Sequence, residues 1–180
     1  MSLHGLTKGT NLESISEMLA KGEAMGTMMY YALARLAKEQ GLDDVSKDFI
    51  EAANQEAVHA GFYATLNAKF PQNFWGLVRG IMAAEYSGET TIKNLADKFR
   101  AAGLAEAADE MEIFAKQEGH HGELMKKLLE KHSPESLNVE GKTIYVCGCC
   151  GFEYIGDLDA EPDDYVCPIC GQPKKVFKLK

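Results

Sequence analysis

Two Glu-x-x-His motifs stand 62 residues apart, one at Glu56 and His59 and the other at Glu118 and His121. Residues three apart lie on the same face of a helix, so each motif can present a carboxylate and an imidazole to one metal ion. A further glutamate precedes each motif, at positions 23 and 85. A glutamate plus Glu-x-x-His, present twice, is the ligand pattern of carboxylate bundles that bind two iron or two manganese ions.

The two motifs belong to a longer internal repeat. When residues 21–63 are aligned with 83–125 without a gap, 10 of the 43 positions are identical, against about two or three expected by chance. The sequence therefore predicts two similar helix pairs that face each other across a pseudo-two-fold axis. The identical pairs are Glu23/Glu85, Gly26/Gly88, Leu33/Leu95, Ala34/Ala96, Gly41/Gly103, Leu42/Leu104, Ala53/Ala115, Gln55/Gln117, Glu56/Glu118 and His59/His121.

The four repeated glutamates share their helical faces with apolar residues, as Glu56 does with Phe49 and Tyr63. A carboxylate in an apolar core is costly unless it is paired or binds a metal. Few basic residues lie on these faces, so we expect cations to offset the negative charge. A mixed set of oxygen and nitrogen ligands without thiolate favours iron or manganese.

Glu89 is an additional carboxylate that the repeat does not require, since its equivalent in the first half is Thr27. It follows Glu85 by four residues and so lies on the same helical face. One more acid in an anionic cluster raises the electrostatic cost, so we predict that Glu89 contacts metal. The alternative is a glutamate at the rim of the site.

Four helical stretches position these residues, at about 10–40, 43–70, 73–102 and 104–131. Gly41, Pro71 and Gly103 separate them, and Thr10 with Glu13 has the spacing of a capping box. Long helices with short connections predict an all-α, up-and-down four-helix bundle over residues 1–132.

All five cysteines lie between positions 147 and 170. Two Cys-x-x-Cys motifs separated by 16 residues predict one four-cysteine metal site made by Cys147, Cys150, Cys167 and Cys170. Tetrahedral sulfur suits either iron or zinc. We expect a small domain over 143–180 that needs its metal to fold, joined by a linker over 133–142. Cys149 is left over, and we expect a partly exposed thiol.

Charge and hydropathy exclude several classes of protein. The chain has 19 Lys and Arg against 27 Asp and Glu, a net charge of −8, which argues against nucleic-acid binding. No apolar run approaches the roughly 20 residues of a membrane helix. The N-terminal residues lack the apolar segment of a secretory signal. We therefore expect a cytoplasmic protein that binds neither nucleic acid nor membrane.

Together these motifs resemble rubrerythrins, in which a ferritin-like di-iron four-helix bundle precedes a rubredoxin domain. The stretches Tyr-Val-Cys147-Gly-Cys-Cys150-Gly-Phe and Tyr-Val-Cys167-Pro-Ile-Cys170-Gly are similar to rubredoxin and favour iron over zinc at the four-cysteine site. The resemblance covers nearly the whole chain. It implies two iron ions bridged by oxo and carboxylate groups, with the ligands Glu23, Glu56, His59, Glu85, Glu118 and His121.

The resemblance also implies roles for particular residues. Glu56 and Glu118 would bridge the two irons, and Tyr30 would lie beside the ligands. Glu89 would be an extra ligand that one iron exchanges for His59 on reduction. The family usually has Glu-x-x-Glu in its third helix, whereas this chain has three residues between Glu85 and Glu89.

The activity implied by the resemblance is reduction of hydrogen peroxide to water, which protects against oxidative stress. The four-cysteine iron would relay electrons from rubredoxin or an NAD(P)H-linked rubredoxin reductase, across a head-to-tail homodimer or a higher oligomer. Two alternatives stay open. One is a ferritin-like protein that oxidises and stores iron, and the other is a structural protein with a zinc tetrathiolate module.

Overall fold

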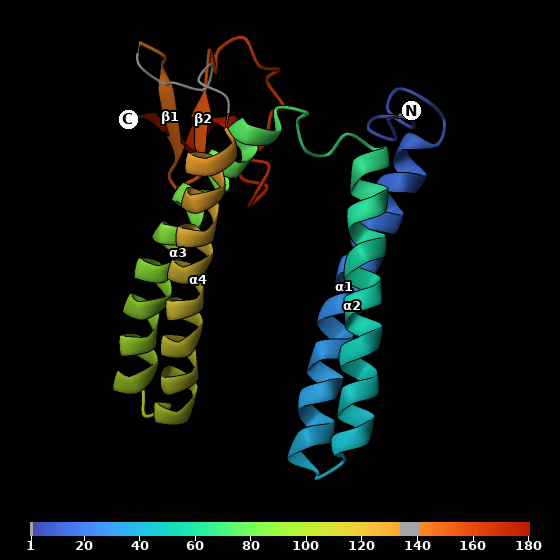
Figure 1. The fold of residues 1–180 in the computed structure, drawn as a ribbon, viewed down its shortest axis with the longest axis vertical. Helices are drawn as coiled ribbons and strands as arrows, with labels where there is room; N and C mark the ends of the chain where they lie inside the picture. Colours follow the sequence, from blue (N-terminus) through green and yellow to red (C-terminus); the bar gives the residue numbers. More distant parts are fainter. Residues whose placement is uncertain (1, 134–140) are drawn as a thin grey trace. The chain divides into compact units, whose positions relative to one another are not determined.

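The computed structural model describes residues 2–133 and 141–180. The chain forms two compact units, Met1–Gln72 and Asn73–Lys180. In the first unit, α1 (Glu13–Glu39) and α2 (Asp43–Leu66) run side by side as an antiparallel hairpin (Figure 1). The second unit begins with an equivalent hairpin of α3 (Phe74–Ala101) and α4 (Ala105–His132).

A small antiparallel sheet follows α4 in the second unit. Its strand order is β2-β1-β3, with β1 at Ile144–Cys147, β2 at Glu153–Ile155 and β3 at Phe177–Leu179. Tyr145 pairs with Tyr154 across β1 and β2, and Cys147 pairs with Phe177 across β1 and β3. A short 3-10 helix, η2 (Lys174–Val176), leads into β3.

The two hairpins turn in the same way, as the repeat predicts. In the first, the Leu42 N–H donates to the Ala37 carbonyl at 2.9 Å, and in the second the Leu104 N–H donates to the Phe99 carbonyl at 3.0 Å. This closing bond is that of a Schellman motif, which needs a left-handed residue directly after the helix cap. Glycine supplies it in both hairpins, at Gly41 with φ +73° and Gly103 with φ +84°.

Helix α2 ends at Leu66, four residues before the predicted end near Phe70. Its last carbonyls bind the N-terminal segment: the Gly5 N–H donates to the Thr65 carbonyl and the Thr7 N–H to the Leu66 carbonyl, both at 3.0 Å. Ala68 then takes the left-handed conformation, with φ +48°. The prediction of a longer helix was wrong because these acceptors are used by residues about 60 positions away.

The predicted capping box at the start of α1 does not form. The helix begins at Glu13, and the Glu13 carboxylate accepts from the Gly9 N–H at 2.7 Å instead of the Thr10 N–H. The Thr10 hydroxyl oxygen accepts from the Leu12 N–H at 3.1 Å. These two side chains therefore satisfy the turn that precedes the helix, because its own N–H groups also need acceptors.

Each helix pair by itself leaves large apolar side chains exposed, such as Met25 and Phe62 in the first unit and Leu95 and Phe114 in the second. Apolar faces of this extent need a covering layer, which a four-helix bundle provides. The four helices and the following cysteine-bearing sheet confirm the predicted fold class. The three-part division at 132 and 143 stays a prediction, since 134–140 lie outside the described residues.

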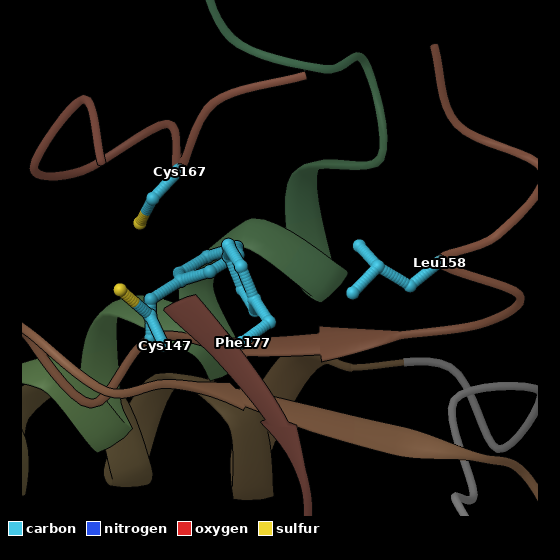
Figure 2. Close-up of a cluster of buried hydrophobic side chains, with 5 residues drawn as sticks. Cys147, Leu158, Cys167 and Phe177 are labelled. Carbon is cyan, nitrogen blue, oxygen red and sulfur yellow. The ribbon is translucent and has the colours of Figure 1, made fainter. Parts of the chain in front are cut away.

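The small sheet region has its own core, which includes two of the cysteines. Cys147, Phe152, Leu158, Cys167 and Phe177 are all buried there. Figure 2 shows the sulfurs of Cys147 and Cys167 pointing toward one another beside the Phe177 ring. Within the residues that the structure describes, no helix is both long and apolar enough to cross a membrane.

We predict that Ala68→Gly stabilises the chain. A left-handed backbone costs an L-residue roughly 1 kcal/mol, and glycine does not incur this cost. The free energy of unfolding, measured by urea titration, should rise by up to about 1 kcal/mol. Ala57→Gly, at an exposed position inside α2, is the control and should lower it by about 1 kcal/mol. Equal losses in the two variants would contradict the strain at position 68.

Candidate metal centres

The first unit brings together Glu23 from α1 with Glu56 and His59 from α2. The His59 Nδ1 atom lies 3.3 Å from an oxygen of Glu56 and 4.0 Å from an oxygen of Glu23. The ligand atoms of the three residues all lie within 4.8 Å of one another. One carboxylate from α1 and a carboxylate–imidazole pair from α2 thus converge at a point where one metal ion fits.

The second unit repeats this group with Glu85 from α3 and Glu118 and His121 from α4. The His121 Nδ1 atom lies 3.4 Å from an oxygen of each glutamate, and the three ligand atoms again lie within 4.8 Å of one another. The structure therefore assembles the six residues predicted from the repeat into two equivalent groups of three. Their role as iron ligands stays a prediction.

Sequence reasoning missed the glycine that makes room for a glutamate in each pair. A Cβ atom at Gly26 would lie 3.6 Å from the Glu56 Cγ atom, and one at Gly88 would lie 3.7 Å from the Glu118 Cγ atom. The same packing thus occurs in both halves of the repeat. The signal was present in the sequence, since Gly26 and Gly88 are an identical pair three residues after Glu23 and Glu85.

The carboxylates of each group influence one another. In the first unit, a hydrogen bond between Glu23 and Glu56 raises the pKa of Glu23 and lowers that of Glu56, with His59 also lowering the latter. In the second, burial and then the neighbouring Glu118 raise the pKa of Glu85. Like charges so close together need a proton or a cation between them. The donor set therefore fits a bound cation.

Glu89 and Tyr30 lie near these groups without joining them. The Glu89 carboxylate packs directly over Gly119 of α4, where an added Cβ atom would lie 2.7 Å from one of its oxygens. Glu89 is not part of the group formed by Glu85, Glu118 and His121. The Tyr30 ring stacks on Phe49, with centroids 6.0 Å apart. Their predicted roles beside the metals stay predictions.

A second contact of α3 with α4 was not predicted. The Tyr86 ring packs over Gly122, and its hydroxyl donates to Glu123 at 2.6 Å, which raises the pKa of Tyr86 to about 12. The equivalent positions in the first half are Ala24 and Gly61, which cannot form this hydrogen bond. A paired change at two equivalent positions of the repeat was the available signal.

The four predicted cysteines form the third group. The Sγ atoms of Cys147 and Cys170 are 3.6 Å apart, as are those of Cys150 and Cys167. Ligands on a tetrahedral metal with bonds of about 2.3 Å stand about 3.8 Å apart, so this cluster fits one ion. Cys149 is exposed, as predicted, and outside the group.

Both Cys-x-x-Cys turns aim backbone N–H groups at sulfur, as the glycine after each motif indicates. The Gly151 N–H donates to the Cys147 carbonyl at 2.9 Å, and the Gly171 N–H donates to the Cys167 carbonyl at 2.8 Å. Burial raises the pKa of Cys167 to about 11, although N–H groups of its turn oppose the shift. Against burial, the Gln172 N–H and neighbouring thiols lower the pKa of Cys170 to about 7.

Comparisons with known proteins agree with these groups. Residues 17–75, which contain Glu23, Glu56 and His59, match the family model named Rubrerythrin. An uncharacterized protein of Methanocaldococcus jannaschii is 29% identical over 71% of this chain and 91% of its own length. Rubrerythrin of Porphyromonas gingivalis is 25% identical over 95% of this chain and 90% of its own length.

Among solved structures, the mixed-valence state of nigerythrin aligns with all of this chain and 94% of its own. Its sequence identity is 20% and the TM-score is 0.32. The resemblance to rubrerythrins that the motifs predict is confirmed by the family model and the relatives.

We predict three metal ions per chain, two held by the carboxylate and histidine groups and one by the cysteines. Elemental analysis after anaerobic reconstitution with ferrous ion is the measurement. His59→Ala and His121→Ala should each lower the metal content while the cysteine-bound metal remains, because each removes one of three ligands from a single group. Glu106→Gln, at an exposed position of α4, is the control. One metal per chain in the unmodified protein would contradict the carboxylate sites.

Proposed function

We propose, on the premise that this chain resembles rubrerythrins in both its helices and its cysteine domain, that it is a peroxidase. Hydrogen peroxide, two electrons and two protons would yield two molecules of water. The observation that carries the proposal is the presence in one chain of two carboxylate–histidine groups and a separate four-cysteine group. The first kind of group suits a reaction with oxygen species, and the second suits one-electron transfer.

Iron is the metal that both kinds of site accept. Carboxylate and imidazole ligands suit iron or manganese, whereas four thiolates suit iron or zinc. Bound iron would supply the one-electron redox changes at both kinds of site. Glu23, Glu56, His59, Glu85, Glu118 and His121 would hold two ions, with Glu56 and Glu118 between them, and Cys147, Cys150, Cys167 and Cys170 would hold the third.

The proposed electron donor is rubredoxin or an NAD(P)H-linked rubredoxin reductase, and the proposed location is the cytoplasm. The acidic composition supports a partner other than nucleic acid. A homodimer or higher oligomer is proposed because the apolar faces of the helix pairs offer a large area for association.

Iron oxidation and storage is the second candidate function, since a ferritin-like protein uses the same carboxylate and histidine ligands. The four-cysteine domain supports the peroxidase, because an electron carrier has no evident use in storage. The two functions differ in iron content: storage predicts many ions per chain after aerobic loading, whereas the peroxidase predicts three.

We predict that Cys170→Ala stops steady-state peroxide consumption with an external reductant. The variant loses one of four thiolate ligands, so electrons have no carrier into the carboxylate groups. Chemically pre-reduced protein should still be oxidised once by peroxide, which stopped-flow absorbance would detect. Cys149→Ser, outside the cluster, is the matched control and should turn over normally. Normal turnover by Cys170→Ala with a rubredoxin reductase would refute the relay.

We predict that Glu89→Gln keeps its metals but loses peroxidase turnover, by roughly tenfold or more, as is common when a group that acts on a bound metal is lost. The amide has the size of the carboxylate, so the packing over Gly119 should persist. Asp97→Asn, at an exposed position of α3, is the control. Normal turnover by Glu89→Gln, with the side chain away from the metals in both oxidised and reduced crystals, would show that Glu89 is no ligand.

A further inference from the structure

The cysteine domain packs closely on α3 of its own unit. The Phe152 ring lies over Gly80 of α3, where an added Cβ atom would be 2.2 Å from the ring. In the reverse direction, a Cβ atom at Gly151 would be 2.6 Å from the Ser87 Cβ atom. Because a glycine on each side permits this approach, the contact is specific to these positions of α3 and of the Cys147–Cys150 turn.

Further contacts hold the domain in this place. Leu77 of α3 packs against the buried cluster that contains Cys147 and Phe152. Glu153 of β2 is only 11% exposed, accepts from the Lys180 ammonium at 2.6 Å and lies 3.9 Å from the Arg79 Nε atom of α3. Burial of a charged side chain between two cations favours one fixed position of the domain.

A cleft of about 260 Å³ lies between the docked domain and the carboxylate group of the second unit. Cys149, Cys150 and Ile169 line it from the cysteine domain, and Glu85, Gly88 and Glu118 from α3 and α4. Cys150 belongs to the four-cysteine group, while Glu85 and Glu118 belong to the carboxylate–histidine group. Both groups of one chain therefore open onto the same cleft.

We propose that electrons pass within one chain, from the four-cysteine site through Cys150 to the side of the carboxylate site held by Glu85 and Glu118. This inference rests on the proposed peroxidase function and replaces the transfer between chains that the family resemblance implies. Each transfer moves one electron across the cleft. Two transfers, drawn from the external reductant, together with two protons convert one hydrogen peroxide to two waters.

The relation of the two groups to the cleft supports this route. Cys147 and Cys167 are buried in the domain core, whereas Cys150 is half-buried and faces the cleft. On the opposite wall, Gly88 and Gly119 leave the helix surfaces low on either side of the Glu118 carboxylate and the Glu89 carboxylate. No described segment of this unit stands between Cys150 and the two glutamates that line the cleft with it.

Mixed oligomers distinguish transfer within a chain from transfer between chains. One chain carries Cys170→Ala and an intact Glu118, and the other carries Glu118→Ala and intact cysteines. The two are co-expressed with different tags, purified as a mixed oligomer, reduced and mixed with peroxide. Transfer within a chain predicts that the red colour of the ferric cysteine site does not return at the rate of the unmodified protein. Its return at a comparable rate would overturn the proposal.

A second test examines the docking without measuring turnover. Gly80→Ala places a methyl group in the space of the Phe152 ring, so the domain should be displaced from α3. Labelling of the Cys149 thiol by a chromogenic disulfide in the metal-loaded protein should become about tenfold faster, as expected for overpacking by one methyl group. Gly61→Ala is the matched control, because nothing lies within 4 Å of a Cβ atom there.

In the same Gly80→Ala protein, reoxidation of the cysteine site by peroxide should slow by about tenfold, while the carboxylate-bound metals should still be oxidised once. Faster labelling with unchanged reoxidation would show that docking on α3 is not the route and would overturn the proposal. If the unmodified protein fails to react with peroxide at all, the proposed peroxidase function fails instead, and the two failures are thereby distinguished.

Discussion

Pairs of carboxylates cannot stand side by side on apolar helical faces unless a proton or a cation lies between them, and this constraint organises the helical part of the protein. Each helix pair brings two glutamates within reach of one histidine, and no lysine or arginine belongs to either group. The glycines opposite Glu56 and Glu118 give these side chains room. Metal binding thus compensates for a charge arrangement that the apoprotein tolerates only by sharing protons.

Most of the helices and both kinds of metal group could be predicted because their signals are local or repeated. The left-handed positions at Gly41 and Gly103 set the hairpin turns, and the spacing of Glu56 from His59 sets which side chains share a face. The early end of α2 could not be predicted in this way. It depends on N–H groups of Gly5 and Thr7, which are distant in sequence and carry no motif.

The position of the cysteine domain on α3 was also beyond the reach of sequence reasoning. Gly80 and Phe152 are an ordinary helical glycine and an ordinary aromatic residue until they are seen in contact. Glu89 shows the same limit, because its spacing from Glu85 places it on the correct face but does not reveal that its carboxylate lies over Gly119. Spacing determines the face of a helix, whereas the small residues of the neighbouring helix decide where a side chain rests.

The similarity of the two hairpins also bears on the ancestry of the chain. Each hairpin has its own turn, its own glycine beneath a glutamate and its own group of three ligands, so each is complete as a metal-binding unit. A chain of this kind is the expected product of duplication and fusion of one gene that encoded a single hairpin. The pairs Thr27/Glu89 and Gly61/Glu123 then mark positions where the halves diverged, with the acidic residue in the half that carries the cysteine domain.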